Sequence, residues 1–203
     1  MVSPSLSEFA VRVLHYPHPT LLRPAKPLAR VDAELRKMVG EMFELMYQHD
    51  GIGLAAPQVD LPYRLFVVNA SGDPNEKDLE YAFINPVLSK PKGSEEKEEG
   101  CLSLPKLYAP VRRPTTIHVS AYNLAGQAVE FDADGLLARV IQHENDHLDG
   151  VMFIDRISQT ALMDVRDQLE DFREEFQRRR ETGEIPADAK IFEQLAALEK
   201  LRT

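Results

Sequence analysis

His143, Glu144 and His147 form an HExxH pattern inside a stretch whose apolar residues recur at helical spacing. Residues four positions apart lie on one face of a helix, so both imidazoles can bind one metal ion while Glu144 faces a water molecule on that metal. A helix this apolar is expected to be buried on most sides, where unpaired polar side chains are costly. The pattern therefore predicts a metal centre on a buried helix, which begins after Asp134 and ends before Gly150.

A catalytic metal centre of this type needs a third protein ligand if its fourth position is to hold water. In the longer pattern HExxHxxGxxH this ligand is a histidine at position 153, and Phe153 excludes it here. One candidate is a glutamate on the following helix, where the chain offers Glu170, Glu174 and Glu175. The other candidate is Cys101, the only cysteine of the chain. The residue pattern alone leaves both candidates open.

Hydrophobic periodicity predicts an α+β fold. Apolar residues at helical spacing, with Asp32 as a candidate N-cap, indicate an amphipathic helix over residues 31–48. Turn signals separate short strands, which we expect at residues 64–68, 82–84, 116–122 and 128–131. Short strands between helices favour antiparallel sheets packed around the buried HExxH helix, with an N-terminal helix and a C-terminal helical extension.

The middle and the end of the chain have compositions of their own. The charged run at residues 92–99 is expected to be solvated, and four prolines are expected to divide this region into short pieces, namely Pro91, Pro105, Pro110 and Pro114. From Ser158 the sequence predicts a highly charged helix and, after a break at Thr182-Gly183, a shorter one. We therefore expect a metal-binding domain over residues 1–157 and a helical extension over residues 158–203.

Composition argues against several classes of protein. A single cysteine cannot form an internal disulfide, and a net charge of −9 disfavours binding to a nucleic-acid duplex. No apolar run approaches the ~18 residues that span a bilayer. Residues 1–17 lack the basic start and the apolar core of a signal peptide. We expect a cytoplasmic protein without a membrane or duplex partner.

Three motifs resemble the signature motifs of the peptide deformylases, in the order in which that family has them. They are Gly51-Ile52-Gly53-Leu54-Ala55-Ala56-Pro57-Gln58, Glu99-Gly100-Cys101-Leu102-Ser103 and Gln142-His143-Glu144-Asn145-Asp146-His147. The resemblance covers roughly residues 8–165. It implies that Cys101, His143 and His147 bind one divalent metal ion, usually Fe²⁺ in the cell and replaceable by Zn²⁺ or Ni²⁺. Thiolate and imidazole ligands suit such metals.

The resemblance also implies a reaction, in which the formyl group of the initiator methionine is hydrolysed from N-formylmethionyl nascent peptides and formate is released. Glu144 would take a proton from the attacking water and deliver it to the departing amine. The side-chain amide of Gln58 and the backbone N–H of Leu102 would stabilise the oxyanion. Residues 1–157 are then a catalytic metallohydrolase domain.

Substrate contacts are expected on two sides of this centre. An extended peptide is expected to approach closely at Ile52, Gly53 and Gly100, where the two glycines leave room for its backbone. The resemblance implies that an apolar pocket for the methionine side chain is built partly from Leu136 and Val140, which share a helix face with the two histidines.

Charged residues near the motifs are expected to support the ligands. Asp146, Glu99 and Arg113 can pair with one another and hold the ligand loops in place. Arg139 and Lys97 flank the expected methionine pocket and are more polar than such a pocket requires.

Two other functions are compatible with the residues. One is a gluzincin-like metallopeptidase that uses Glu170, Glu174 or Glu175 as its third ligand, and the other is a catalytically silent scaffold stabilised by its metal.

The resemblance also implies a possible partner for the C-terminal helix, because this helix docks on the ribosome in bacterial deformylases. Arg178-Arg179-Arg180 is the segment that can meet RNA phosphates here. The acidic residues around these arginines fit a solvated helix equally well.

Overall fold

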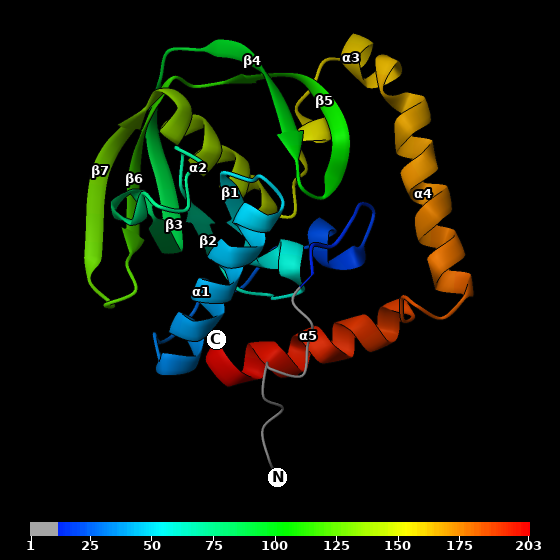
Figure 1. Ribbon diagram of the computed structural model, residues 1–203, viewed down its shortest axis with the longest axis horizontal. Helices are drawn as coiled ribbons and strands as arrows, with labels where there is room; N and C mark the ends of the chain where they lie inside the picture. The colour runs from blue at the N-terminus through cyan, green and yellow to red at the C-terminus, as the bar shows by residue number, and fades with distance from the viewer. Residues whose placement is uncertain (1–11) are drawn as a thin grey trace.

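Two antiparallel sheets build the body of the protein (Figure 1). The structure is a computed structural model that describes residues 12–203. The larger sheet has the strand order β1-β2-β3-β6-β7, and β4 and β5 form a separate hairpin. The strands are β1 (Gly53–Ala55), β2 (Leu65–Val68), β3 (Tyr81–Lys92), β4 (Glu95–Cys101), β5 (Leu104–Arg113), β6 (Thr116–Tyr122) and β7 (Ala128–Asp134). Every neighbouring pair is antiparallel, which confirms the predicted α+β class.

Two helices share the inner strand β2, because this strand is apolar on both sides. Leu65 and Val67 pack into the same cluster as residues of α1 (Ala33–Gln48). Phe66 and Val68 pack instead with residues of α2 (Gly135–Leu148). Successive side chains of a strand point to opposite faces, so four consecutive apolar residues can serve both helices. The core thereby fixes α2, the helix that carries the HExxH pattern, against the larger sheet.

The ends of both helices follow the capping signals only in part. The Asp32 side chain accepts a hydrogen bond from the Leu35 N–H at 2.8 Å, so the predicted cap of α1 is confirmed. Asp134 stands at the N-cap position of α2, but its side chain makes no capping hydrogen bond. Gly150 follows the last turn of α2 with a φ of 72°, a left-handed conformation that glycine adopts without steric cost.

The middle of the chain is more regular than its prolines predict. The expectation of a break is wrong at Pro91, Pro105 and Pro110, and correct at Pro114, which lies between β5 and β6. Strand β3 continues through Pro86 and Pro91 because its pairing with β6 shifts register at both places, so neither proline has to donate a ladder hydrogen bond. Strand β5 includes Pro105 and Pro110 because it pairs with β4 alone and leaves one edge unpaired.

The charged run at residues 92–99 is also more ordered than expected. Its second half forms β4, which pairs with β5 from the Glu95–Arg113 pair onward. Residues 95–98 are exposed, as predicted for a solvated run, but Glu99 is buried. Burial of this carboxylate requires charged partners, which α2 and β5 supply.

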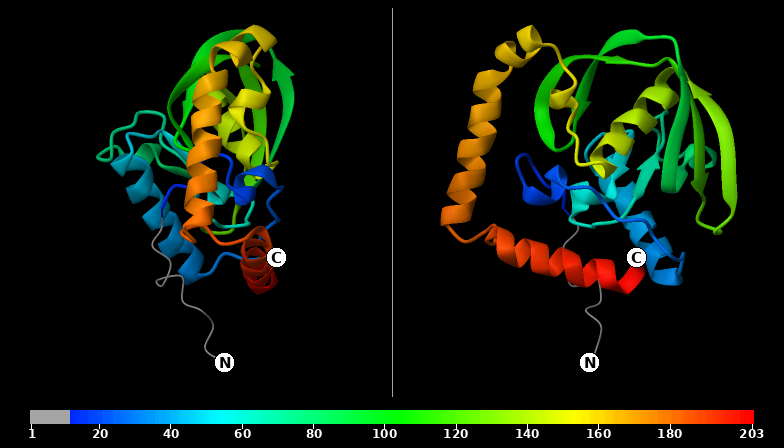
Figure 2. Two further views of the ribbon diagram at one scale, coloured as in Figure 1. Left: turned by 90° about the vertical axis from the view of Figure 1, so that its right-hand side faces the viewer. Right: turned by 180° about the vertical axis from the view of Figure 1, so that it is seen from behind.

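Three further helices form an arm along one side of the body (Figure 2). They are α3 (Gln159–Asp164), α4 (Arg166–Glu181) and α5 (Asp188–Arg202), and the short 3₁₀ helices elsewhere are η2 (Pro19–Leu22), η3 (Ala56–Val59), η4 (Lys77–Leu79) and η5 (Phe153–Asp155). The arm returns to the body at α5, where the Tyr63 hydroxyl donates to the Leu198 carbonyl at 2.9 Å and Arg202 pairs with Asp32 at 2.6 Å. The division of the chain at residue 157 stays a prediction.

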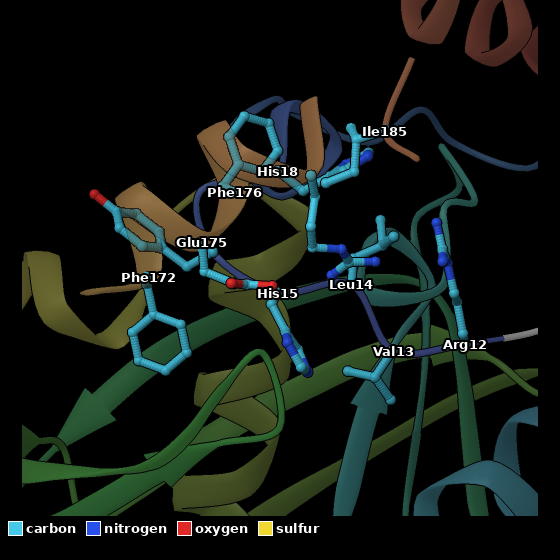
Figure 3. A pocket seen from close by; sticks show the side chains of 11 residues that line it. Arg12, Val13, Leu14, His15, His18, Phe172, Glu175, Phe176 and Ile185 are labelled. Carbon is cyan, nitrogen blue, oxygen red and sulfur yellow. The ribbon is translucent and has the colours of Figure 1, made fainter. Parts of the chain in front are cut away.

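A small cavity of about 80 Å³ lies where α4 meets the segment that follows residue 11 (Figure 3). His15 and His18 line it from that segment, and Phe172 and Phe176 line it from α4. The Phe176 and His18 rings meet edge to face with their centroids 6.2 Å apart, so α4 is packed on the body here as well.

Residues 1–11 begin the predicted 1–157 domain and carry most of the argument against a signal peptide, and they lie outside the described residues. Within residues 12–203, no helix combines the length and the apolar character needed to cross a membrane.

Candidate active site

Three side chains that commonly bind metals meet between the β4–β5 hairpin and α2. Cys101 ends β4 at the turn into β5, and His143 and His147 lie one turn apart on α2. One ligand atom of each residue lies within 4.8 Å of the other two, and Cys101 Sγ is 3.3 Å from His147 Nε2. One sulfur and two imidazole nitrogens at this spacing are a donor set that fits one divalent metal ion.

Glu99 contacts the first of these histidines, His143, through a ring nitrogen. Its Oε2 lies 3.0 Å from His143 Nδ1, which leaves Nε2 of that ring free to act as a ligand. Arg113 binds both oxygens of Glu99, with Nε 2.6 Å from Oε1 and Nη2 2.9 Å from Oε2. Arg139 places Nη1 2.6 Å from the same Oε1. All four side chains are buried or nearly so.

A second carboxylate extends this network along α2. Asp146 accepts a hydrogen bond from Arg113 Nη1 at 2.8 Å and also binds Arg156, which follows η5. Asp146, Glu99 and Arg113, which the sequence predicted to pair, therefore form one connected cluster. Arg113 links β5 to α2 through it.

The pKa values of Glu99 and His143 follow from their contact. Burial disfavours the ionised carboxylate, but the hydrogen bonds and charges of His143 and Arg113 outweigh it and lower the pKa of Glu99 to about 2. Burial also disfavours the charged imidazole, but Cys101 and Glu99 outweigh it and raise the pKa of His143 to about 10, so a metal ion bound at this site would have to displace the proton on Nε2. Glu99 is therefore ionised at neutral pH and accepts the proton on His143 Nδ1.

Glu144 is buried beside the cluster and keeps one carboxylate oxygen free. Within residues 12–203, its Oε2 has no hydrogen-bond partner. A side chain at Gly53 would collide with its Oε1, so the carboxylate lies against the first motif. Burial raises the pKa of Glu144 to about 7, which suits a group that gains and loses a proton near neutral pH. An unpartnered oxygen of this kind fits a catalytic group, which must keep an oxygen available for a reacting water molecule.

Gln58 is fixed with its amide nitrogen toward the cluster. Its Oε1 accepts from the Ala55 N–H at 2.8 Å, while Nε2 lies 3.2 Å from Ser103 Oγ and 3.5 Å from Cys101 Sγ. Its backbone carbonyl accepts from the Leu14 N–H at 2.8 Å. This residue belongs to η3, directly after β1, so the first motif is an edge strand and a 3₁₀ turn and not only a loop.

A cleft of about 650 Å³ leads to these groups. The predicted substrate residues line it together with the predicted oxyanion residues, namely Ile52, Gly53, Gly100, Leu136, Val140, Gln58 and Leu102. Val140 is buried, whereas Leu136 is 52% exposed and forms part of the rim. Tyr108 lies beside Gly100, where an added Cβ would come within 2.5 Å of its ring.

Other residues take positions that the sequence did not predict. Arg139 points to Glu99, and Lys97 is exposed and pairs with Glu95. Arg139 lies four residues before His143 and therefore on the same helix face, so the sequence could have indicated that both residues contact Glu99. No sequence pattern near Arg156 indicates that it binds Asp146. Ring stacking joins His143 to Phe153, with the centroids 6.0 Å apart.

The alternative third ligands lie apart from the cluster. Glu170, Glu174 and Glu175 are exposed on α4, where Glu170 pairs with Arg173 and Glu175 with Arg178. Of these three, Glu175 lines the small cavity beside His15, and none lines the cleft.

Comparisons with known proteins agree with this arrangement. The sequence profile described as polypeptide deformylase matches residues 10–162. A peptide deformylase of Rhodopirellula baltica is 44% identical over 191 residues, which are 94% of either chain. The crystal structure of a plant peptide deformylase shares 36% identity with a TM-score of 0.82 and covers 88% of this chain and 96% of its own. The Plasmodium falciparum enzyme shares 34% identity with a TM-score of 0.80, over 82% of this chain and 97% of its own.

The family profile covers both sheets and α2, and the bacterial relative matches nearly the whole chain, including most of the C-terminal arm. The profile match, the identity to whole relatives and the shared fold therefore show that this chain belongs to the polypeptide deformylase family, metal-dependent hydrolases that remove N-formyl groups from nascent peptides.

Proposed function

We propose that this chain hydrolyses the N-formyl group of the initiator formylmethionine of nascent polypeptides and releases formate. The observation that carries the proposal is the cluster of Cys101, His143 and His147, which lies beside the buried carboxylate of Glu144 at the cleft. The family membership supplies the reaction class.

Cys101, His143 and His147 would hold a single divalent metal ion, Fe²⁺ in the cell, with Zn²⁺ or Ni²⁺ as substitutes. One thiolate and two imidazoles suit each of these ions. When bound, the ion supplies a Lewis acid that polarises the formyl oxygen and lowers the pKa of water. Asp146, Glu99 and Arg113 support the ligands, because Glu99 orients the His143 ring and Arg113 joins both carboxylates.

Glu144 acts as the general base and then as the general acid. Its free oxygen accepts the proton of the attacking water as the oxygen of that water bonds to the formyl carbon. The same carboxyl then gives this proton to the nitrogen of the leaving amine, and the C–N bond breaks. The Gln58 amide and the Leu102 N–H donate to the oxyanion of the tetrahedral intermediate.

The substrate backbone passes along Ile52, Gly53 and Gly100, where the two glycines, which have no side chain, permit close approach. The methionine side chain enters the part of the cleft lined by Val140, with Leu136 at its rim. Formylmethionyl peptides arise during translation, so we place the enzyme in the cytoplasm.

Anaerobic purification followed by metal analysis and a formate-release assay tests metal, reaction and substrate together. Glu144→Ala should fold and bind metal but release formate about 10²- to 10⁴-fold more slowly, since general acid–base catalysis contributes that much. Turnover near the wild-type rate would overturn the role of Glu144 and favour a silent scaffold.

The third ligand is tested separately. Cys101→Ser should lose both tight metal binding and deformylase activity, whereas Glu174→Ala, an exposed change on α4, should lose neither. The opposite result would favour the gluzincin-like alternative.

We also propose that the C-terminal arm contacts the ribosome through Arg178, Arg179 and Arg180 at the end of α4. In the structure these arginines pair with Glu175, Glu184 and Asp188, so phosphates must displace these partners. Co-sedimentation with ribosomes should decrease with added salt and should be lost after truncation at Gln177. Unchanged binding by the truncated chain would contradict the proposal.

A further inference from the structure

The three ligand residues belong to two bodies that share no sheet. Cys101 is carried by the β4–β5 hairpin, which has no ladder hydrogen bonds to the larger sheet. His143 and His147 are carried by α2, whose apolar face packs on that larger sheet. The spacing of the ligand atoms therefore depends on what joins the hairpin to α2.

Arg139 joins them at three points. From α2, its Nη1 donates to Glu99 Oε1 at 2.6 Å and to the Val111 carbonyl at 3.0 Å, and its Nη2 donates to the Glu95 carbonyl at 2.9 Å. Glu99 and Glu95 lie on β4 and Val111 lies on β5, so one guanidinium bridges α2 to both strands of the hairpin. Its side chain is 10% exposed, which shields these hydrogen bonds from water.

The contact between Arg139 and Glu99 also determines which oxygen of Glu99 faces His143. Oε1 receives Arg139 Nη1 and Arg113 Nε, both at 2.6 Å, and Oε2 receives Arg113 Nη2 at 2.9 Å and lies 3.0 Å from His143 Nδ1. A carboxylate bound by two guanidinium groups cannot rotate without breaking charge-assisted hydrogen bonds. The His143 ring is oriented by an acceptor that is itself fixed.

We propose that Arg139 is a positioning residue that sets the ligand geometry, by fixing the Glu99 carboxylate behind His143 and by holding the Cys101-bearing hairpin at its distance from α2. This role rests on the metal centre proposed above and adds a residue to it. This role also explains why Arg139 lies beside the proposed pocket for the methionine side chain. Its guanidinium group faces Glu99 and the two strands of the hairpin.

Arginine is required for this role because its planar group offers several donors in a fixed fork, whereas lysine offers a single charged nitrogen. After loss of Arg139, Glu99 keeps Arg113 as a charged partner, so the buried carboxylate stays paired and the variant is expected to fold.

The test is the affinity of the metal-free protein for Co²⁺, measured by competition with a chelator for the wild type, Arg139→Met, Arg139→Lys and the control Arg112→Met. Arg112 lies next to Arg113 on β5, is exposed, and pairs with Glu96 on the same hairpin. We expect about 10- to 100-fold weaker Co²⁺ binding for both Arg139 variants, as for other residues that orient metal ligands. The control should bind like the wild type.

All titrations are made well below the unfolding temperature of each variant, so a loss of stability alone does not change the measured affinity. The visible spectrum of bound Co²⁺ reports ligand geometry independently and should change in Arg139→Lys. Equal affinities and spectra in the wild type and Arg139→Lys would overturn the role of Arg139. A wild type that binds no Co²⁺ would instead overturn the metal centre, and this role with it.

Discussion

The carboxylate of Glu144 occupies the space that any side chain at Gly53 would need. A Cβ built there would collide with Glu144 Oε1 and lie 2.8 Å from Val140 Cγ1, closer than real carbon atoms approach. The glycine of the first motif therefore has a steric role in addition to any contact with substrate.

Gly53→Ala should displace the Glu144 carboxylate and lower kcat by about 100-fold, since a shift of about 1 Å in a catalytic group has that effect. Steady-state kinetics with a formylmethionyl peptide measures it, and metal content should stay at the wild-type level. Gly40→Ala is the matched control, because Gly40 lies in α1 and a Cβ there meets nothing within 4 Å. The control should keep full activity and gain about 0.5–1 kcal/mol of stability.

Gly100 faces a more adaptable neighbour. A Cβ at this position would lie 2.5 Å from the Tyr108 ring, but Tyr108 is 60% exposed and can move. Gly100→Ala should therefore turn the ring into the cleft and raise KM more than it lowers kcat. The double variant Gly100→Ala, Tyr108→Ala should recover most of the lost kcat/KM. No recovery would mean that the peptide itself needs the space at Gly100.

The docking of α5 on the body should depend on pH through Asp32. A hydrogen bond from Arg202 lowers the pKa of Asp32 below its value in the unfolded chain. A carboxyl group shifted in this direction stabilises the fold above its unfolded pKa and loses that contribution as the pH falls through its folded pKa.

Arg202→Met should therefore lower the free energy of unfolding at pH 7 by about 1–2 kcal/mol, the worth of a charge-assisted hydrogen bond reduced by the partial exposure of Asp32. The difference from the wild type should begin to shrink below about pH 4, where this carboxyl is protonated in the unfolded chain, and should disappear as the pH falls through the lower pKa that Asp32 has in the folded protein. Urea unfolding across this range measures it. Lys37→Met is the control, because its exposed pair with Glu41 is worth less than about 0.5 kcal/mol. If the loss of stability in Arg202→Met did not depend on pH, it would be explained by lost packing alone.

Metal removal should destabilise the protein, because the ligands come from two separate bodies that the metal would join. At 100 times its Kd, a ligand that binds only the folded state adds about 2.7 kcal/mol. Zn²⁺ added to the metal-free enzyme should raise the Tm, and Mg²⁺, which prefers oxygen ligands, should not. Cys101→Ser should remove most of the Zn²⁺ effect. An equal shift in that variant would show binding elsewhere.

Local signals predicted the elements that carry the site. The helix at residues 31–48, the strand at 116–122 and the helix between Asp134 and Gly150 were correct because each has a strong period and clear ends. The single charged helix expected from Ser158 is instead two helices, α3 and α4, which are separated at Val165.

The signals failed where pairing partners lie far away in the sequence. A proline taken with only its near neighbours in the sequence predicts the end of a strand. Pro86 and Pro91 instead lie where the register between β3 and β6 shifts. Such a shift can be recognised only when the positions of both strands are known.

The same limit applies to the site. The HExxH spacing by itself indicates two of the three proposed ligand residues. Preferring Cys101 to a glutamate as the third requires either the family resemblance or the cluster that the structure shows. The sequence predicts that Glu99 supports the ligands, but the acidic run in which it lies gives no sign that its side chain is buried. A buried carboxylate and a solvated one look alike in sequence, and only the positions of Arg113 and Arg139 distinguish them.

The return of α5 to the start of α1 has a consequence for biosynthesis. Arg202 binds Asp32 and Glu34 in the first turn of α1, so residues separated by most of the chain close the same corner of the protein. Contacts between such distant segments form late and slow folding. During translation, α1 cannot complete its packing until the last helix has emerged. A newly made copy therefore reaches its final form only after α5 has been synthesised.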